Sequence, residues 1–234
     1  MHSWPGRTDS AAGLAWQPIV QARSGDADVA LALTDSACPA RLTLGLALRQ
    51  CRTWCDLGLR IGVRVRLQVT DGLDAAFVAT VEAGLEHEGL PPALLQLEVA
   101  ERSLRRDPAR AVAALHDLRA LGAPVALDRL APGSWSPARL PDWPIDELAM
   151  PAERLVRSTV EQTHARGWRC LATQIDDLLG AARAASLAAD ALHGPYWGAP
   201  RSAAALTDWL LAESAAREAL AARPVPVVPA ALAA

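Results

Sequence analysis

Lysine and asparagine are both missing from this chain of 234 residues, so all 23 basic side chains are arginine. The basic residues are slightly outnumbered by 26 acidic ones, which gives a formal net charge of −3. This balance argues against a basic surface for nucleic acid or for an anionic membrane. Apolar runs are short and are broken by charges or proline, so we expect no transmembrane helix.

The first residues, MHSWPGRTDSAAG, lack the apolar stretch that signal peptides carry, and we expect a cytoplasmic protein. Cysteine is scarce as well and is limited to Cys38, Cys51, Cys55 and Cys170. Cys51 and Cys55 have the spacing of one helical face, but no histidine or Cys-x-x-Cys pair nearby completes a zinc site. We interpret these residues as reduced thiols that serve as small core residues.

Short β-like runs alternate with helical stretches along most of the chain. Asp107 and Pro108 are typical of a helix start, and Gly122 is placed to end that helix. The strand candidates are 16–22, 29–33, 64–69, 94–99, 125–128, 146–150, 170–174 and 189–192. Eight strands with helices between most of them favour a (β/α)8 barrel. An open doubly wound sheet is the alternative, although no glycine-rich phosphate loop follows any strand.

The composition supports a folded domain, because 51% of the residues are hydrophobic and 21% are charged. We expect the barrel to span 13–222. A flexible segment, 1–12, precedes it, and a loose tail rich in proline and alanine, 223–234, follows it.

Acidic residues fall where strands of the barrel are expected to end, which is where chemistry sits in this architecture. They are Glu98, Glu101, Asp128, Asp176 and Asp177, with His193 after the last strand. Carboxylates at successive strand ends can bind divalent metal ions. The alternative is that the aspartates are ordinary helix caps and that the glutamates are solvated.

Five segments carry a resemblance to a known family. They are WQPIVQARSG, LLQLEVAERSL, GAPVALDRLAPGSWSPARLPDWPIDELAM, CLATQID and HGPYWGAP, in this order along the chain. Together they resemble the EAL domain family, metal-dependent phosphodiesterases that cleave the bacterial messenger cyclic di-GMP. The resemblance implies a TIM-like barrel whose first strand is antiparallel to the rest. It also implies that the segment between Leu33 and Cys51 is shorter than in the family, between strands 2 and 3.

The family's functional positions are largely substituted here, and the resemblance implies that they are vestigial. The signature glutamate corresponds to Leu31, the phosphate-binding arginine to Asp35, the metal-binding asparagine to Arg66 and the catalytic lysine to Ala149. Further substitutions fall on Arg129, Thr173 and His193, whereas the acids at Glu101 and Asp128 are kept and Asp176 conservatively replaces a glutamate.

These departures predict an inactive phosphodiesterase with no metal, no other cofactor and no catalytic residue. The family mechanism needs a lysine and an asparagine, and the chain contains neither. Two arginines would place positive charge where cations sit in the family. We expect Arg66, and also Arg129, to occupy that space and to pair with Glu101 or Asp128.

Three functions remain open from the sequence. The first is binding of a bacterial regulatory protein in motility, pilus, transcription or biofilm signalling, through a surface that includes Trp135, Trp143 and Trp197. The second is a cyclic di-GMP receptor, for which Gln17 and Pro18 would lie beside the nucleotide, but Asp35 would repel its phosphodiester. The third is an enzyme with new chemistry at the same strand ends.

Overall fold

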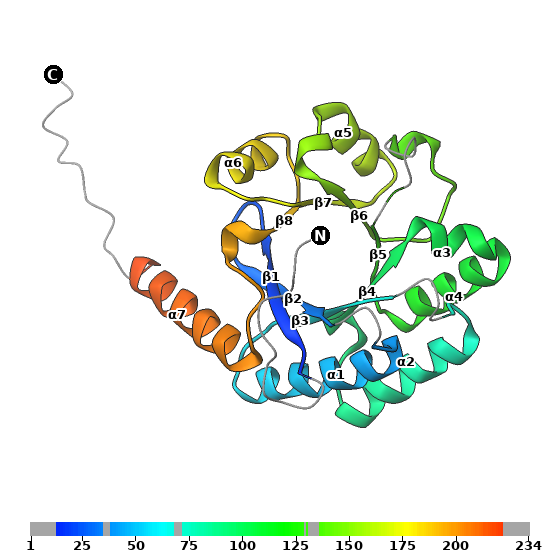
Figure 1. Cartoon of the computed structure of the whole chain (residues 1–234), viewed down its shortest axis with the longest axis horizontal. Helices are drawn as coiled ribbons and strands as arrows, with labels where there is room; N and C mark the ends of the chain where they lie inside the picture. Colours follow the sequence, from blue (N-terminus) through cyan, green and yellow to red (C-terminus); the bar gives the residue numbers. More distant parts are fainter. Residues whose placement is uncertain (1–12, 35–37, 68–71, 129, 131–135, 222–234) are drawn as a thin grey trace, which may run out of the picture.

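The computed structural model describes residues 13–34, 38–67, 72–128, 130 and 136–221, and these form a closed barrel of eight strands with helices outside it (Figure 1). The strands are β1 (Ala15–Gln21), β2 (Ala27–Leu33), β3 (Gly62–Arg66), β4 (Leu95–Ala100), β5 (Val125–Asp128), β6 (Glu147–Pro151), β7 (Arg169–Thr173) and β8 (Ala191–His193). Strand β1 is antiparallel to β2 and to β8, and every other neighbouring pair is parallel. The predicted barrel with an antiparallel first strand is confirmed.

Helices return the chain between the parallel strands. They are α1 (Ala40–Asp56), α2 (Ala75–Glu88), α3 (Glu101–Arg106), α4 (Pro108–Leu121), α5 (Arg157–Ala165), α6 (Leu178–Ser186) and α7 (Ala203–Ala221), with single 3-10 turns at η1 (Pro92–Leu94), η2 (Pro137–Arg139), η3 (Ala152–Arg154) and η4 (Pro195–Trp197). Within the described residues, α1 is the one helix between β2 and β3.

Capping residues explain where several helices begin and end. The Asp107 carboxylate accepts a hydrogen bond from the Arg110 N–H, which fixes the start of α4, and Asp177 does the same for α6 through Gly180. Gly122 ends α4 with a φ of 93°, a left-handed conformation that glycine adopts without a steric penalty. The predicted boundaries of α4 are therefore confirmed within one residue.

Three strands, β2, β3 and β8, differ from the sequence-based prediction by two residues or more at one or both ends, and strand β2 begins at Ala27, two residues earlier than predicted. Strand β3 begins at Gly62 and ends at Arg66, whereas the predicted run extended to Val69. Strand β8 begins at Ala191, two residues later than predicted. The short helix α3 was not predicted, because six residues with three arginines do not show an apolar period.

The core has two parts because side chains on a strand alternate between the two faces of the sheet. Outward-facing residues pack beneath the helices in the large cluster that includes Val63, Val65 and Leu97. Inward-facing residues form a smaller cluster inside the barrel, made of Ile19, Val29, Leu31, Ala149, Leu171 and Ala191. The inner cluster lies on β1, β2, β6, β7 and β8, which leaves polar side chains on β3, β4 and β5.

The cysteines are unpaired, and Cys51 and Cys170 are buried as predicted. Burial raises the pKa of the Cys51 thiol to about 12, so this side chain stays protonated and packs as a small core residue. Within the described part of the chain, no helix has the length and hydropathy to cross a membrane. The predicted terminal segments 1–12 and 223–234 lie outside the described residues.

Candidate functional site

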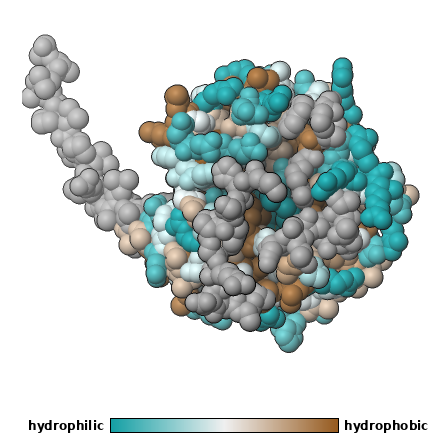
Figure 2. Space-filling model, viewed as in Figure 1, coloured by the Kyte–Doolittle hydropathy of each residue, from teal (hydrophilic) through white to brown (hydrophobic). Residues whose placement is uncertain are grey.

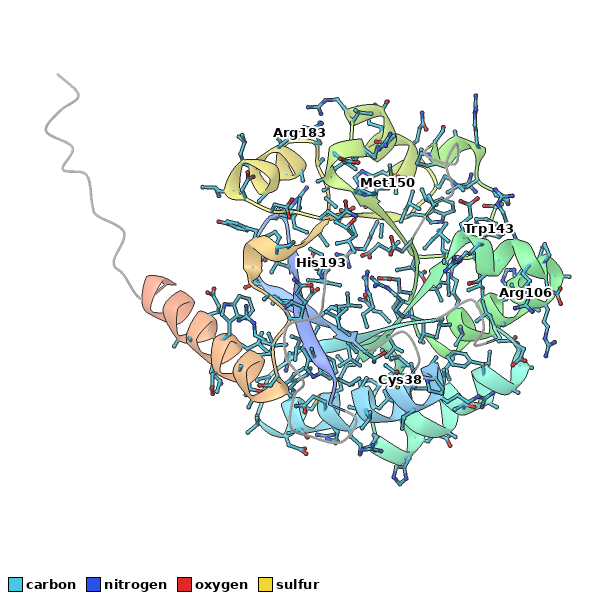
Figure 3. All side chains as sticks on the ribbon, in the orientation of Figure 1. Cys38, Arg106, Trp143, Met150, Arg183 and His193 are labelled. Carbon is cyan, nitrogen blue, oxygen red and sulfur yellow. The ribbon has the colours of Figure 1, made fainter. Side chains whose placement is uncertain are left out.

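A cavity of about 510 Å³ opens at the carboxyl ends of the barrel strands. Its volume is within the range of small-molecule sites. Its lining comes from β1 to β8 and the loops that follow them: Ile19, Leu31, Arg66, Glu98, Asp128, Leu130, Ala149, Pro151, Leu171, Thr173, Gln174, His193, Gly194 and Pro195. Figure 3 shows the side chains that fill the interior of the barrel, with His193 labelled on β8.

Arg66, Glu98 and Asp128 form the polar wall of this cavity. Arg66 and Asp128 are the last residues of β3 and β5, and Glu98, two residues before the end of β4, is the direct neighbour of Arg66 in the parallel register. The Arg66 Nε donates to a Glu98 carboxylate oxygen, and its Nη2 lies 3.7 Å from Asp128 Oδ2. The Glu98 side chain is 3% exposed, compared with 32% for Arg66. One guanidinium therefore bridges two carboxylates in the polar wall of the cavity.

A second arginine lies one layer deeper in the barrel. Arg64 is 1% exposed, and its Nη2 donates at 2.6 Å to Gln96 and at 2.6 Å to Glu147. Its Nη1 is 3.8 Å from the second carboxylate oxygen of Glu98. The charged side chains thus form one connected network, from Glu147 through Arg64 to Glu98 and Arg66.

This deeper layer was not predicted from the sequence, although a signal for it was present. Arg64 and Arg66 alternate with Val63 and Val65 along β3, so the period of two places both arginines on the inner face. Gln96 and Glu98 show the same period on β4.

The electrostatics of Glu98 and Arg66 keep both groups charged. Burial raises the pKa of the Glu98 carboxyl, but Arg66 and Arg64 outweigh burial and hold this pKa below its usual value. Burial likewise lowers the pKa of Arg66, and Glu98 and Asp128 raise it above the usual value. The pair therefore stays ionised at neutral pH.

His193, at the end of β8, is a neutral polar group in the cavity wall. Burial lowers its pKa to about 4, with Arg64 and Arg66 acting in the same direction and Glu98 opposing them. Its Nε2 atom is buried and has no hydrogen-bond partner among the described residues. A buried nitrogen without a partner is costly, so a donor or acceptor that reached it would gain a hydrogen bond.

The structure brings together some of the predicted site residues and separates others. Leu31, Ala149 and Thr173 line the cavity with Arg66, Asp128 and His193. Asp176 is exposed and is not part of the lining. Asp35 and Arg129 lie outside the described residues.

The predicted pairing of Arg66 with Asp128 is confirmed, but its predicted alternative with Glu101 is wrong. Glu101 is the first residue of α3, and its carboxylate accepts from Arg105 Nε at 2.6 Å, one turn later in the same helix. Because the strand turns into a helix at Glu101, this side chain leaves the cavity lining, and Glu98 takes the place beside Arg66.

The residues predicted to lie beside a nucleotide or on a partner surface differ in where the structure places them. Gln17 is buried in β1 and donates to the Gly198 carbonyl at 3.0 Å, and neither it nor the buried Pro18 belongs to the described lining. Trp143 was expected to be exposed and is instead buried, with Arg105 over its ring at 5.6 Å. Trp197 is half-buried against the core, and Trp135 lies outside the described residues.

The side chains around Arg66 do not fit a divalent cation. Such a cation needs several oxygen ligands of negative or neutral charge, and here a guanidinium contacts the two carboxylates that would supply them. Among the residues that the structure describes, no three His, Cys, Asp or Glu side chains are grouped to hold a metal ion.

This geometry can be compared with that of known proteins. The EAL domain of Mycobacterium smegmatis DcpA is similar in fold, with a TM-score of 0.76 and 20% identity over 88% of this chain and 98% of that one. The family model described as "EAL domain" matches residues 40–200. This chain belongs to the EAL domain family.

Two further proteins are similar to this EAL domain. It matches the PaMucR phosphodiesterase, solved in complex with cyclic di-GMP, with a TM-score of 0.72 and 22% identity over 82% of this chain and 93% of that one. It is also 36% identical over 106 residues to the uncharacterized protein Rv1357c of Mycobacterium tuberculosis, covering 44% of this chain. The match covers 34% of the length of Rv1357c.

Proposed function

We propose that this EAL domain does not hydrolyse cyclic di-GMP and that it acts in cyclic di-GMP signalling by binding a bacterial regulatory protein. The observation that carries the proposal is the position of Arg66, whose guanidinium contacts both Glu98 and Asp128. A fixed positive charge at this place repels divalent cations and occupies the oxygens that would coordinate them.

The residue content of the chain supports the same proposal. No lysine is present to stabilise charge during phosphodiester cleavage, and Leu31 and Ala149 supply only apolar atoms to the cavity. Loss of metal ions and of a positioned cationic group each lowers the rate of such a reaction by orders of magnitude.

A hydrolysis assay tests the first half of the proposal. Purified protein is incubated with cyclic di-GMP and Mg²⁺ or Mn²⁺, and the linear dinucleotide is measured by chromatography beside an active EAL phosphodiesterase. We expect no product from this chain. Product formation that follows the protein through successive purification steps, and that disappears in Asp128→Asn, would show that the domain is an enzyme.

Exposed leucines on α6 support the second half of the proposal. Leu178 and Leu179 are adjacent, are 67% and 77% exposed and begin the helix that follows β7, so they lie on the same side of the barrel as the cavity. Figure 2 shows hydrophobic side chains protruding at this edge of the molecule. Neighbouring exposed leucines on a folded domain are typical of an interaction surface.

Affinity capture from the source bacterium, with the chain as bait, tests this surface. We expect Leu178→Ser combined with Leu179→Ser to remove a specific partner from the captured proteins. Leu57→Ser is the matched control, since Leu57 is 56% exposed but lies at the end of α1, on the opposite side of the barrel. Equal capture by the double variant and the control would mean that α6 does not form the partner surface.

A cyclic di-GMP receptor without hydrolysis is the second candidate function. The open cavity of about 510 Å³ and the similarity to a phosphodiesterase solved with cyclic di-GMP favour it, and the carboxylates of Glu98 and Asp128 oppose it. Calorimetric titration with cyclic di-GMP, with and without Mg²⁺, distinguishes the two functions. Binding that is saturable and independent of Mg²⁺ would favour the receptor.

A further inference from the structure

The cavity at the barrel mouth has two chemically different walls. One wall is apolar and is formed by Ile19 and Leu31 on the first two strands and by Leu171 on β7. The other wall is polar, and His193 lies on it together with the ion pairs of Arg66. A ligand that fits both walls has an apolar body and a polar group at one end.

His193 carries a hydrogen-bonding group that the folded chain leaves unused. Its Nε2 is buried and has no hydrogen-bond partner among the described residues, although the side chain lines the cavity (Figure 3). Nε2 is closed to water in this conformation, and rotation of the imidazole about χ2, a broad torsion, can turn it toward the cavity. Because a buried polar atom without a partner is costly, a ligand group that satisfies this nitrogen removes that cost.

A charged ligand group is disfavoured beside His193, whichever its sign. Burial is the largest influence on the pKa of His193, and it penalises any charge placed there. Arg64 and Arg66 oppose a positive charge at this position, and Glu98 opposes a negative one. The ring itself follows the same rule, since its pKa is lowered to about 4 and it is neutral at neutral pH. The surroundings of His193 therefore favour an uncharged ligand group.

Among uncharged groups, a hydroxyl fits His193 in either tautomer. It donates to Nε2 when the ring proton is on Nδ1, and it accepts from Nε2 when the ring proton is there. A carbonyl oxygen only accepts, so it bonds to one tautomer alone.

We propose that the cavity binds a small neutral alcohol or phenol, with its hydroxyl group on His193 Nε2 and its body against the apolar wall. This site needs neither a metal ion nor a phosphate group. It shares with the proposed function its dependence on Arg66 in the polar wall, but it does not depend on the binding of a regulatory protein.

Four probes with one phenyl ring and different head groups test this proposal. Benzyl alcohol carries the hydroxyl, toluene lacks a polar group, benzylamine is cationic and benzoate is anionic, so the ring contact stays constant. Binding to the full chain is measured by ligand-observed NMR titration at neutral pH. We expect benzyl alcohol to bind at least about fivefold more tightly than toluene, which leaves Nε2 unsatisfied, and more tightly than either charged probe.

Variants at His193 locate the hydroxyl group. His193→Phe keeps an aromatic ring without a nitrogen, and we expect it to remove the preference for benzyl alcohol over toluene while toluene still binds. His193→Gln keeps a neutral donor and acceptor, so it should retain most of the preference. His87→Gln changes a histidine that is 83% exposed on α2, and as the control it should alter neither affinity.

A change in the lining locates the phenyl ring. Ala149→Phe places a ring in the space that the probes would fill, and it should weaken benzyl alcohol and toluene alike at least about tenfold. The amide NMR signal of Gly194, which lines the cavity next to His193, gives the location without a substitution. It should shift when benzyl alcohol is added to the wild-type chain.

The outcomes separate this proposal from the proposed function. Toluene or a charged probe binding as tightly as benzyl alcohol, a preference that persists in His193→Phe, or no binding of benzyl alcohol would overturn the alcohol site. None of these results bears on hydrolysis, because the linear dinucleotide is measured in the absence of the probes. Conversely, hydrolysis of cyclic di-GMP would contradict the proposed function whatever the phenyl probes do.

Discussion

The Arg66 side chain crosses β4, so its Nη2 lies 3.7 Å from the Asp128 carboxylate on β5 while its Nε donates to Glu98. One side chain thus joins three neighbouring strands near their carboxyl ends. The resemblance to the EAL domain family implies metal ligands at this edge of the barrel. The Arg66 guanidinium offsets the repulsion between the Glu98 and Asp128 carboxylates, which a bound metal cation would do in its absence.

Arg66→Ala should destabilise the domain, because it leaves the buried Glu98 carboxylate with only the more distant Arg64. We expect a loss of about 2 kcal/mol in the free energy of unfolding by urea, below the full cost of breaking a buried pair because Arg66 is one-third exposed. Arg52→Ala, which breaks an exposed pair with Asp56 on α1, is the control and should have no measurable effect. Equal stability of the two variants would show that the bridge contributes nothing.

Arg64→Ala should be more damaging than Arg66→Ala, since Arg64 is fully buried and pairs with Glu147 inside the barrel. We expect a loss of about 3–5 kcal/mol, because the variant leaves buried carboxylates unpaired. The double variant Arg64→Met with Glu147→Leu removes both charges at similar volume and should recover most of the stability. If the double variant is as unstable as Arg64→Ala, packing and not charge explains the loss.

The half-buried His193 should make the stability depend on pH. Its pKa is about 4 in the folded protein, below the ordinary value of 6.5, so the unfolded chain binds this proton more readily between these two values. Stability is therefore complete above pH 6.5 and falls as the pH drops toward 4, by up to roughly 3 kcal/mol for this group.

Urea unfolding at a series of pH values measures this dependence. His193→Gln should flatten the slope between the two pKa values, whereas the exposed His87→Gln should leave it unchanged. Burial raises the pKa of Glu98, but Arg66 and Arg64 outweigh burial and hold this pKa below its ordinary value. Glu98 therefore adds stability that is present above its unfolded pKa and is lost at still more acidic pH. A slope that is identical in wild type and His193→Gln would contradict the assignment of a neutral histidine at this position.

Gly194→Ala should disrupt the loop that closes the cavity after β8. A Cβ atom at this position would lie 2.8 Å from the Ile175 carbonyl carbon and would also clash with the Ile175 nitrogen and oxygen. Because these are backbone atoms, the loop must move, and we expect a loss of about 1–3 kcal/mol. Gly45→Ala within α1 is the control and should be neutral or stabilising, since only an arginine side-chain end lies nearby. Similar thermal midpoints for both variants would exclude a close fit at Gly194.

The alternation of strands and helices was predictable because it depends on local chemistry. Asp107, Pro108 and Gly122 act on the backbone next to them, so the limits of α4 follow from the sequence. The short α3 was not predictable in this way, and its presence turned Glu101 toward Arg105.

In the amino-acid sequence, the alternation of strands and helices favoured the barrel. The motifs, in their order along the chain, carried the resemblance to the family and, through it, implied the antiparallel first strand. The sequence also placed an arginine at position 66, where the resemblance to the family implies a metal ligand. Only the tertiary structure decided which carboxylates Arg66 meets, why Trp143 is buried and that Arg64 continues the charge network inward. The physical reason is that these contacts join strands that are distant in the chain, and the register of a closed barrel, which no local pattern specifies, sets which side chains face each other.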